Sequence, residues 1–211
     1  MRILSVDTTG ETGSIALVGE RGVIEEVTLH SPDGFAHTLF PAIQSLLARH
    51  ALTLESLTGF ASASGPGSFT GVRVGLTAVK GLAEATGRKV AAVSNLRALA
   101  SFGTHERRAV VIDARRGEIY GAVYDAQLRV LQEEIVAPLP QWLAGLPPGD
   151  LEFITQGFDP GRPFTLAPAA IAGAIGSIAL EEFVRGNAQD PAMIDANYVR
   201  RSDAELFWKE V

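Results

Sequence analysis

Apolar residues recur along the chain with two different periods, which predict alternating strands and helices. In the first half, short apolar runs predict five strands, at residues 3–6, 14–18, 23–29, 57–64 and 89–93. Apolar residues three and four positions apart predict helices at residues 37–50, 70–86 and 96–102. Three strands followed by alternating helices and strands predict an α/β layer that contains both parallel and antiparallel pairs.

The second half begins as the first does. Residues 109–113 predict an apolar strand that ends at Asp113, followed by a glycine turn and a returning strand at 118–124, as Asp7 ends the opening strand. This similarity predicts a twofold internal repeat and two related lobes. The polar stretch at 103–108 divides them, so the predicted domains are residues 1–104 and a smaller lobe of residues 105–211. Further strands at 129–136 and 153–154 and a helix at 169–185 are assigned to the second lobe.

The most distinctive stretch is Ser-Gly-Pro-Gly-Ser-Phe-Thr-Gly-Val-Arg-Val-Gly, residues 64–75. Its first glycines and proline predict a sharp turn between a strand and a helix. Ser68 is placed to cap that helix at its N-terminus, and Gly87 to end it. The turn lacks the lysine of a phosphate-binding P-loop, so the glycines alone are a nonspecific phosphate signal.

The helix that follows has two apolar stripes where a surface helix ordinarily has one. The second stripe carries Gly71, Gly75, Ala78 and Leu82. Glycines lower helix stability by about 1 kcal/mol each relative to alanine, so they call for a packing reason. Two interpretations stay open: tight packing within this chain, or a docking face for another subunit. The docking interpretation predicts that Gly75→Trp prevents association while the protein stays folded.

Composition is that of a globular protein, with 46% hydrophobic and 20% charged residues. The net charge of −6 gives no overall basic face for nucleic acid, although arginine pairs occur at 107–108, 115–116 and 200–201. The chain has no cysteine, which excludes disulfides and thiolate metal sites. It shows neither a signal peptide nor an apolar run long enough to cross a bilayer, so a cytoplasmic protein with no membrane partner is expected.

Candidate catalytic chemistry is sparse. The opening Asp7-Thr8-Thr9 turn can hold a phosphate or hydrated metal ion, or it can satisfy its own backbone as an Asx turn. The four histidines form no metal-binding pair, and no Gly-x-Ser-x-Gly motif is present. If Asp7 faces Asp113 between the lobes, an autonomous ATPase or phosphotransferase remains the alternative to a binding protein.

Two motifs resemble a known family. Residues 65–75 and the stretch Ile-Asp-Ala-Arg-Arg-Gly-Glu-Ile-Tyr at 112–120 are similar to those of the TsaB (YeaZ) family, glycoprotease-like accessory proteins of bacterial tRNA threonylcarbamoyladenosine synthesis. The opening Asp7-Thr8-Thr9 and the closing Tyr198-Val199-Arg200 also look like that family, so the resemblance spans nearly the whole chain.

The resemblance implies a two-lobed α/β fold of the actin-like, sugar-kinase and Hsp70-type ATPase superfamily, related to ribonuclease H. It implies a noncatalytic subunit that activates TsaD, which transfers threonylcarbamoyl to the tRNA adenosine next to the anticodon, with TsaE assisting. ATP and metal are then expected on TsaD, with no cofactor, metal or catalytic residue on this chain; Asp7, Thr8 and Thr9 are the candidate cofactor ligands if there is one. Contact with tRNA is expected through the complex, and a homodimer is expected in isolation.

The resemblance also places the partner interface on the helices at 37–50 and 70–86. The residues expected there are Leu39, Ile43, Leu46, Gly71, Arg73, Val74, Gly75, Ala78 and Leu82. Two positions depart from the family pattern: Phe35-Ala36 replace a His-Ser/Thr pair before Pro41, and Ala196 replaces a proline. The first departure bears on the contact made by the first helix.

Overall fold

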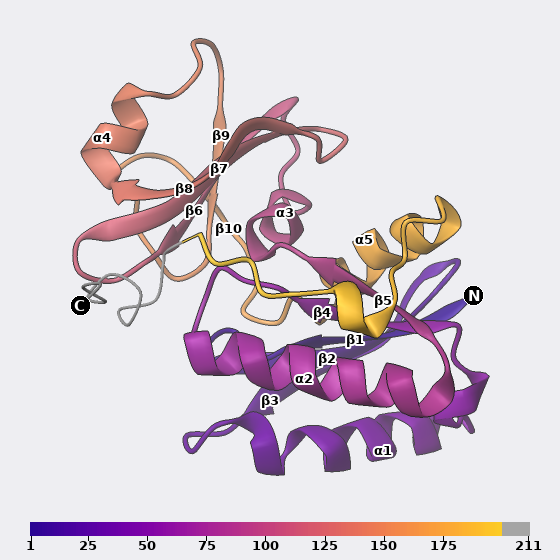
Figure 1. Cartoon of the computed structure of the whole chain (residues 1–211). Coiled ribbons are helices and arrows are strands. Elements are labelled where there is room, and N and C mark those ends of the chain that lie inside the picture. Colours follow the sequence, from indigo (N-terminus) through magenta and orange to yellow (C-terminus); the bar gives the residue numbers. More distant parts are fainter. Residues whose placement is uncertain (200–211) are drawn as a thin grey trace, which may run out of the picture. The chain divides into compact units, whose positions relative to one another are not determined.

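The computed structural model describes residues 1–199, which form two compact units (Figure 1). Unit 1 comprises Met1–Ala98 and Pro168–Ala196, and unit 2 comprises Leu99–Ala167 with residues 197–199. Arg200, and with it the arginine pair at 200–201, lies outside the described residues. None of the helices within residues 1–199 has the length and apolarity that a bilayer crossing requires.

Unit 1 is built on a five-stranded mixed sheet in the order β3-β2-β1-β4-β5. Its strands are β1 (Arg2–Asp7), β2 (Thr12–Gly19), β3 (Gly22–His30), β4 (Gly59–Ala63) and β5 (Lys89–Val93). The central strand β1 pairs antiparallel with β2 and parallel with β4, whose other neighbour β5 is also parallel. The predicted mixture of parallel and antiparallel pairs is therefore confirmed.

Helices cover both faces of this sheet because side chains of a strand alternate between its faces. The helices of unit 1 are α1 (Leu39–Arg49), α2 (Phe69–Thr86), α3 (Asn95–Ala100, which reaches into unit 2) and α5 (Ala172–Val184). Leu4 and Val6 of β1 pack with residues of α1 and α2 in the main apolar core. Ser5, between them, points to the other face and donates to the Ala172 carbonyl of α5 at 2.6 Å.

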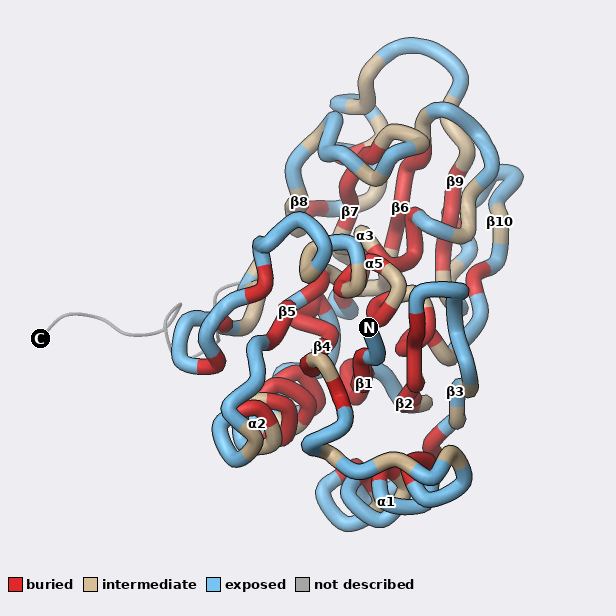
Figure 2. Tube along the Cα trace, turned by 90° about the vertical axis from the view of Figure 1, so that its right-hand side faces the viewer, coloured by how far each residue is buried: buried red, intermediate tan, exposed pale blue. Residues whose placement is uncertain are grey.

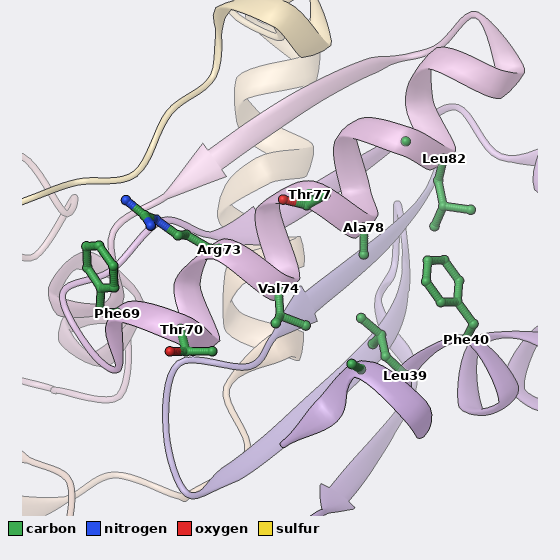
Figure 3. A pocket seen from close by; sticks show the side chains of 11 residues that line it. Leu39, Phe40, Phe69, Thr70, Arg73, Val74, Thr77, Ala78 and Leu82 are labelled. Carbon is green, nitrogen blue, oxygen red and sulfur yellow. The ribbon is translucent and has the colours of Figure 1, made fainter. Parts of the chain in front are cut away.

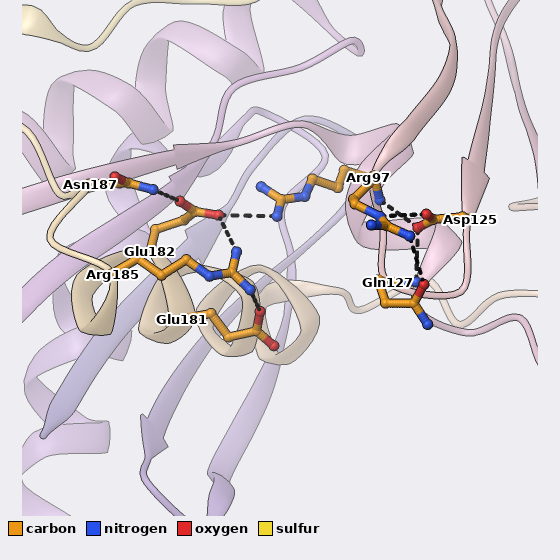
Figure 4. A network of polar contacts seen from close by, with 8 residues as sticks. Arg97, Asp125, Gln127, Glu181, Glu182, Arg185 and Asn187 are labelled. Atoms are coloured by element: carbon orange, nitrogen blue, oxygen red, sulfur yellow. Dashed lines mark hydrogen bonds and ion pairs between the residues drawn. The ribbon is translucent and has the colours of Figure 1, made fainter.

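Short 3-10 turns at Phe35–His37, Leu54–Ser56 and Pro191–Met193 complete unit 1. A polar cluster ties α3 to α5: Arg97 donates to Glu182 at 3.0 Å, and Glu182 also accepts from Arg185 and Asn187 (Figure 4). Burial opposes ionisation of Glu182, but these hydrogen bonds and charges outweigh it and lower its pKa.

Unit 2 repeats the topology of unit 1. Its strands are β6 (Arg107–Asp113), β7 (Glu118–Asp125), β8 (Val130–Pro138), β9 (Glu152–Thr155) and β10 (Thr165–Leu166), with the short helix α4 (Leu139–Ala144). The order β10-β9-β6-β7-β8 places β6 antiparallel to β7 and parallel to β9, as β1 lies between β2 and β4. The twofold repeat predicted from the sequence is confirmed. Trp142 of α4 packs edge-on to Phe153 in the core of this unit, with ring centroids 6.3 Å apart.

The division between the units differs from the predicted one mainly in residues 168–196, which contain α5 and the 3-10 turn at Pro191–Met193. The predicted domains split at residues 104 and 105, whereas α5 packs on β1 and β2 and belongs to unit 1. Gly176 makes this possible, since a Cβ there would lie 2.5 Å from Val18 and 2.6 Å from the Ser5 hydroxyl. The chain therefore returns to its first sheet near its end.

Helix α2 begins and ends where the sequence predicts. The Ser68 hydroxyl accepts a hydrogen bond from the Gly71 amide at 3.2 Å, and Gly87 ends the helix in the left-handed conformation with φ of 62°. One side of α2 is buried and the other is exposed or half-buried, as Figure 2 shows.

The glycines of α2 divide between these two sides. Gly71 lies against the backbone of Thr8, and a Cβ at Gly71 would overlap the Thr8 carbonyl oxygen. Gly75 is equally enclosed, because a Cβ added there would lie 2.7 Å from the Thr8 hydroxyl oxygen and 3.1 Å from the Ser62 hydroxyl oxygen. Gly81 is exposed, and a Cβ there meets nothing within 4 Å.

We predict opposite effects of alanine at the two kinds of position. Gly81→Ala should raise the free energy of unfolding by about 0.5–1 kcal/mol, because alanine restricts the unfolded chain and favours the helix. Gly71→Ala should lower it by about 1–3 kcal/mol or more, because the added methyl group must displace the Thr8 backbone. Urea unfolding of the two variants measures both effects, and a stabilised Gly71→Ala protein would contradict the packing described.

Candidate functional site

A groove lies along the outer side of α2, beside the start of α1 (Figure 3). Its volume is about 720 Å³. The residues lining it are Ala36, Leu39, Phe40, Phe69, Thr70, Arg73, Val74, Thr77, Ala78, Gly81 and Leu82. All of them belong to unit 1, and most are apolar or small.

The two ends of the groove are marked by aromatic rings. Phe69 and Phe40 are 44% and 47% exposed, which is high for large apolar side chains. Figure 3 shows Phe40 facing Leu82 at one end and Phe69 beside Arg73 at the other, with Val74 and Ala78 between them. The Arg73 guanidinium lies 3.8 Å from the centre of the Phe69 ring, an arrangement that cation–π attraction favours.

The helical repeat explains why this side of α2 is open. Val72, Leu76, Val79 and Ala83 recur every three or four residues and are buried toward the sheet. The other side of α2 carries Arg73, Val74, Thr77 and Gly81. The short side chains among them allow close approach to the helix backbone. A second helix can approach such a surface closely.

The structure separates the predicted interface residues into two groups. Arg73, Val74, Ala78 and Leu82, together with Leu39, line the groove. Two of these groove residues, Leu39 and Ala78, also belong to the core and are only 1% and 7% exposed. The others do not line the groove: Ile43 and Leu46 are 2% and 0% exposed, and Gly71 and Gly75 pack against Thr8.

The reason predicted for two of the glycines therefore needs correction. Gly71 and Gly75 allow close packing within this chain, one of the two interpretations open from the sequence. Gly75→Trp consequently cannot serve as a surface substitution, because its side chain would have to enter the core between Thr8 and Ser62. Gly81 is the glycine of α2 that faces the groove.

Sequence reasoning missed several residues of the groove. Phe40, Phe69, Thr70, Thr77 and Gly81 line it but were not among the predicted interface residues. Phe40 shares the helical spacing of Leu39, Ile43, Leu46 and Leu47, so the pattern alone places it in the α1 core, whereas the structure leaves it 47% exposed. Phe69 is the first residue of α2, and although its spacing from Val72 and Leu76 matches the buried stripe, it is exposed.

The side chains of the Asp7-Thr8-Thr9 turn form hydrogen bonds with other groups of this chain. One Asp7 carboxylate oxygen accepts from the Thr9 amide at 2.9 Å and from the Thr9 hydroxyl at 2.6 Å. The Thr8 hydroxyl donates to the Gly71 carbonyl at 2.6 Å, and Asn95 donates to the Thr9 hydroxyl at 2.5 Å. This is the Asx-type turn of the two alternatives considered, and it joins β1 to the first turn of α2.

Asp7 is only 2% exposed, and this burial raises its pKa above 3.8 in spite of the hydrogen bonds from Thr9. The negative charge of Glu26 raises it further. Asp113 is the corresponding residue of unit 2, where its carboxylate accepts from the Arg115 amide at 2.8 Å. Within residues 1–199, no three histidine or acidic side chains gather closely enough to bind a metal ion.

Comparison with known proteins identifies relatives over the whole chain. A family model described as TsaD, tRNA N6-adenosine threonylcarbamoyltransferase, matches residues 23–160. The tRNA threonylcarbamoyladenosine biosynthesis protein TsaB of Bacillus subtilis is 30% identical over 226 residues, covering 100% of this chain and 99% of the relative. TsaB of Escherichia coli is 33% identical over 171 residues, covering 74% of this chain and 71% of the relative.

A solved structure agrees with these relatives. YeaZ from Pseudomonas aeruginosa superposes with a TM-score of 0.80 at 29% identity, covering 93% of this chain and 99% of that chain. The predicted α/β fold class with two mixed sheets is confirmed.

Replacing Asp7 should reveal the cost of its burial through the pH dependence of stability. A folded-state pKa raised above the unfolded value means that the folded protein keeps the proton to higher pH, so Asp7 reduces stability as pH rises above about 4. Asp7→Asn keeps an oxygen acceptor for Thr9 and carries no charge. The melting temperature of Asp7→Asn minus that of the original protein should therefore increase between pH 4 and pH 7.5. Calorimetry of both proteins across this pH range measures the difference. If this difference in melting temperature decreases over the same pH range, folding stabilises the ionised form of Asp7, which would contradict the raised pKa.

Proposed function

Because the chain belongs to the TsaB family of tRNA threonylcarbamoyladenosine biosynthesis proteins, we propose that it acts as a noncatalytic subunit that binds and activates a TsaD threonylcarbamoyltransferase. The α1–α2 groove is the binding surface in this proposal. In this proposal TsaD binds ATP and the metal ion and catalyses the transfer, and TsaE assists. This chain meets tRNA as part of the complex, in the cytoplasm.

The observation that carries the proposal is the exposed apolar side of α2. Scattered apolar residues are normal on protein surfaces, but here two phenylalanines and several small residues share one groove of about 720 Å³. Aromatic residues are enriched in protein interfaces relative to the rest of the surface. A helix pair presented in this way suits a partner that also offers helices, and in isolation a second copy can take the same place.

A noncatalytic role is supported by how the candidate ligands are used. Asp7, Thr8 and Thr9 hold α2 against β1 through their own hydrogen bonds, and Gly71 fills the space beside them. The autonomous ATPase or phosphotransferase considered from the sequence has no comparable observation in its favour. The family model that matches residues 23–160 of this chain is described as TsaD, which supports a pair of related subunits that divide the work.

Gly81→Trp tests the surface directly. The added side chain should fill the groove while the fold is kept, because Gly81 is exposed and has open space around it. We expect affinity for TsaD from the same organism to fall at least about tenfold, since the approaching helix loses its place. Isothermal titration calorimetry measures the affinity, and circular dichroism checks the fold.

Ala48→Trp is the matched control. Ala48 is an exposed residue of α1 that does not line the groove, so tryptophan there should leave affinity within about threefold of the original. Unchanged binding by Gly81→Trp would refute the groove as the site. Equal loss in both variants would show a nonspecific effect of the added tryptophan and would also count against it.

A further inference from the structure

One face of the unit 2 sheet is only partly covered near the edge strand β8. Val136 of β8 lies opposite Tyr120 of β7, and Val130 lies opposite Tyr124, so these four side chains share a face of the sheet. The short helix α4 packs on the other face. Tyr124 is buried, Tyr120 and Val136 are half-buried, and Val130 is 46% exposed. Burial therefore decreases toward the sheet edge, where Tyr120, Val130 and Val136 form a partly open surface that we call the β8 patch.

The described part of the chain ends beside this patch. The Asn197 side-chain amide donates to the Glu134 carboxylate at 2.6 Å, and the Tyr124 hydroxyl donates to the same carboxylate at 2.7 Å. Residues 197–199 belong to unit 2, as β7 and β8 do. The chain therefore reaches residue 200 close to the β8 patch, and twelve residues follow Val199.

The sequence of residues 200–211 complements the surface of β8. The segment opens with the basic pair Arg200-Arg201 and contains the apolar run Leu206-Phe207-Trp208. Strand β8 contains Glu133 and Glu134 and no basic residue. Opposite charges favour the approach of the segment to β8, and large apolar side chains, two of them aromatic, provide the area that covers the patch.

The length of the segment also suits this position. Glu134 and Val130 are four residues apart along β8, which corresponds to about 13 Å at about 3.3 Å per residue. Leu206 is nine residues beyond Asn197, a separation of about 13 Å in a helix and at most about 30 Å in an extended chain. The apolar run can therefore reach the patch in either conformation.

We propose that residues 200–211 fold back on unit 2 of the same chain, so that Leu206-Phe207-Trp208 cover the β8 patch and Arg200-Arg201 lie near Glu133 and Glu134. This inference goes beyond the proposed function and concerns the isolated chain, so it holds or fails independently of TsaD binding. The packing also shields apolar surface at a sheet edge, a place where association with other chains is otherwise favoured.

Fluorescence of Trp208 tests this packing. Trp142 is the other tryptophan of the chain, so the emission of the original protein minus that of Trp208→Phe isolates the signal of Trp208. Acrylamide should quench this signal at least about threefold less efficiently in the folded protein than in denaturant, because a docked indole ring is shielded from water. Equal quenching in both conditions would overturn the proposal. Protection that is lost on dilution would place the segment on a second copy of the chain and would also overturn it.

Val130→Asp tests the patch, and Leu166→Asp is its matched control. Val130 and Leu166 are 46% and 65% exposed, and they lie on β8 and β10, the two opposite edges of the same sheet. Val130→Asp should raise the quenching of Trp208 at least about threefold, because it places a charge against the apolar run. Leu166→Asp should leave the quenching nearly unchanged. The proposal fails if Val130→Asp has no effect or if both variants raise the quenching equally.

A cysteine at position 130 gives a second readout that does not depend on fluorescence. The chain has no cysteine of its own, so Val130→Cys provides a single site for alkylation. Its alkylation in the 211-residue chain should accelerate at least about threefold when Phe207 and Trp208 are both changed to Asp, because the covering side chains then favour water. Circular dichroism verifies that each protein is folded. Equal alkylation rates in the folded proteins would contradict the packing of this segment on β8.

Discussion

The close packing of α2 against the Asp7-Thr8-Thr9 turn determines how unit 1 is organised. Gly71 touches the Thr8 backbone, and the Thr8 hydroxyl bonds to the Gly71 carbonyl at 2.6 Å. The Ser68 amide also donates to the Thr9 carbonyl at 2.7 Å, so the start of α2 is fixed at two points. This contact also orients α2, because the side that faces Thr8 decides which residues face outward.

The repeated topology of unit 2 shows what is special about unit 1. The strands β6 to β10 correspond in order and direction to β1 to β5. The connection between β4 and β5 contains the eighteen-residue helix α2, whereas the described connection between β9 and β10, residues 156–164, contains no helix. The counterpart of α1 is reduced to the six residues of α4. Unit 1 therefore has a pair of longer helices, α1 and α2, for which the described residues of unit 2 contain no equivalent.

Much of this architecture could be predicted from the sequence, because local chemistry specifies it. Ser68 and Gly87 have the side-chain and backbone properties of helix caps, and the two Asp-ending strands reveal the repeat. The sheet on which α5 packs could not be predicted, because an apolar helix with glycines fits either sheet. The direction in which Gly71 and Gly75 face depends on Thr8, more than sixty residues away in sequence, so the helical pattern alone left two interpretations open. Phe40 and Phe69 were missed because both fit the helical spacing of neighbouring core residues, so the pattern alone does not reveal that they are exposed.

The most direct measurement follows from the absence of cysteine in the chain. A single cysteine at Thr77, on the exposed side of α2 in the groove, and another at Ala48 outside the groove can each be alkylated with and without TsaD. The account predicts that TsaD slows alkylation at position 77 by at least about tenfold and leaves position 48 nearly unchanged, since only the groove loses its access to solvent. Formation of a stable complex in which position 77 reacts as fast as in the free protein would contradict the account.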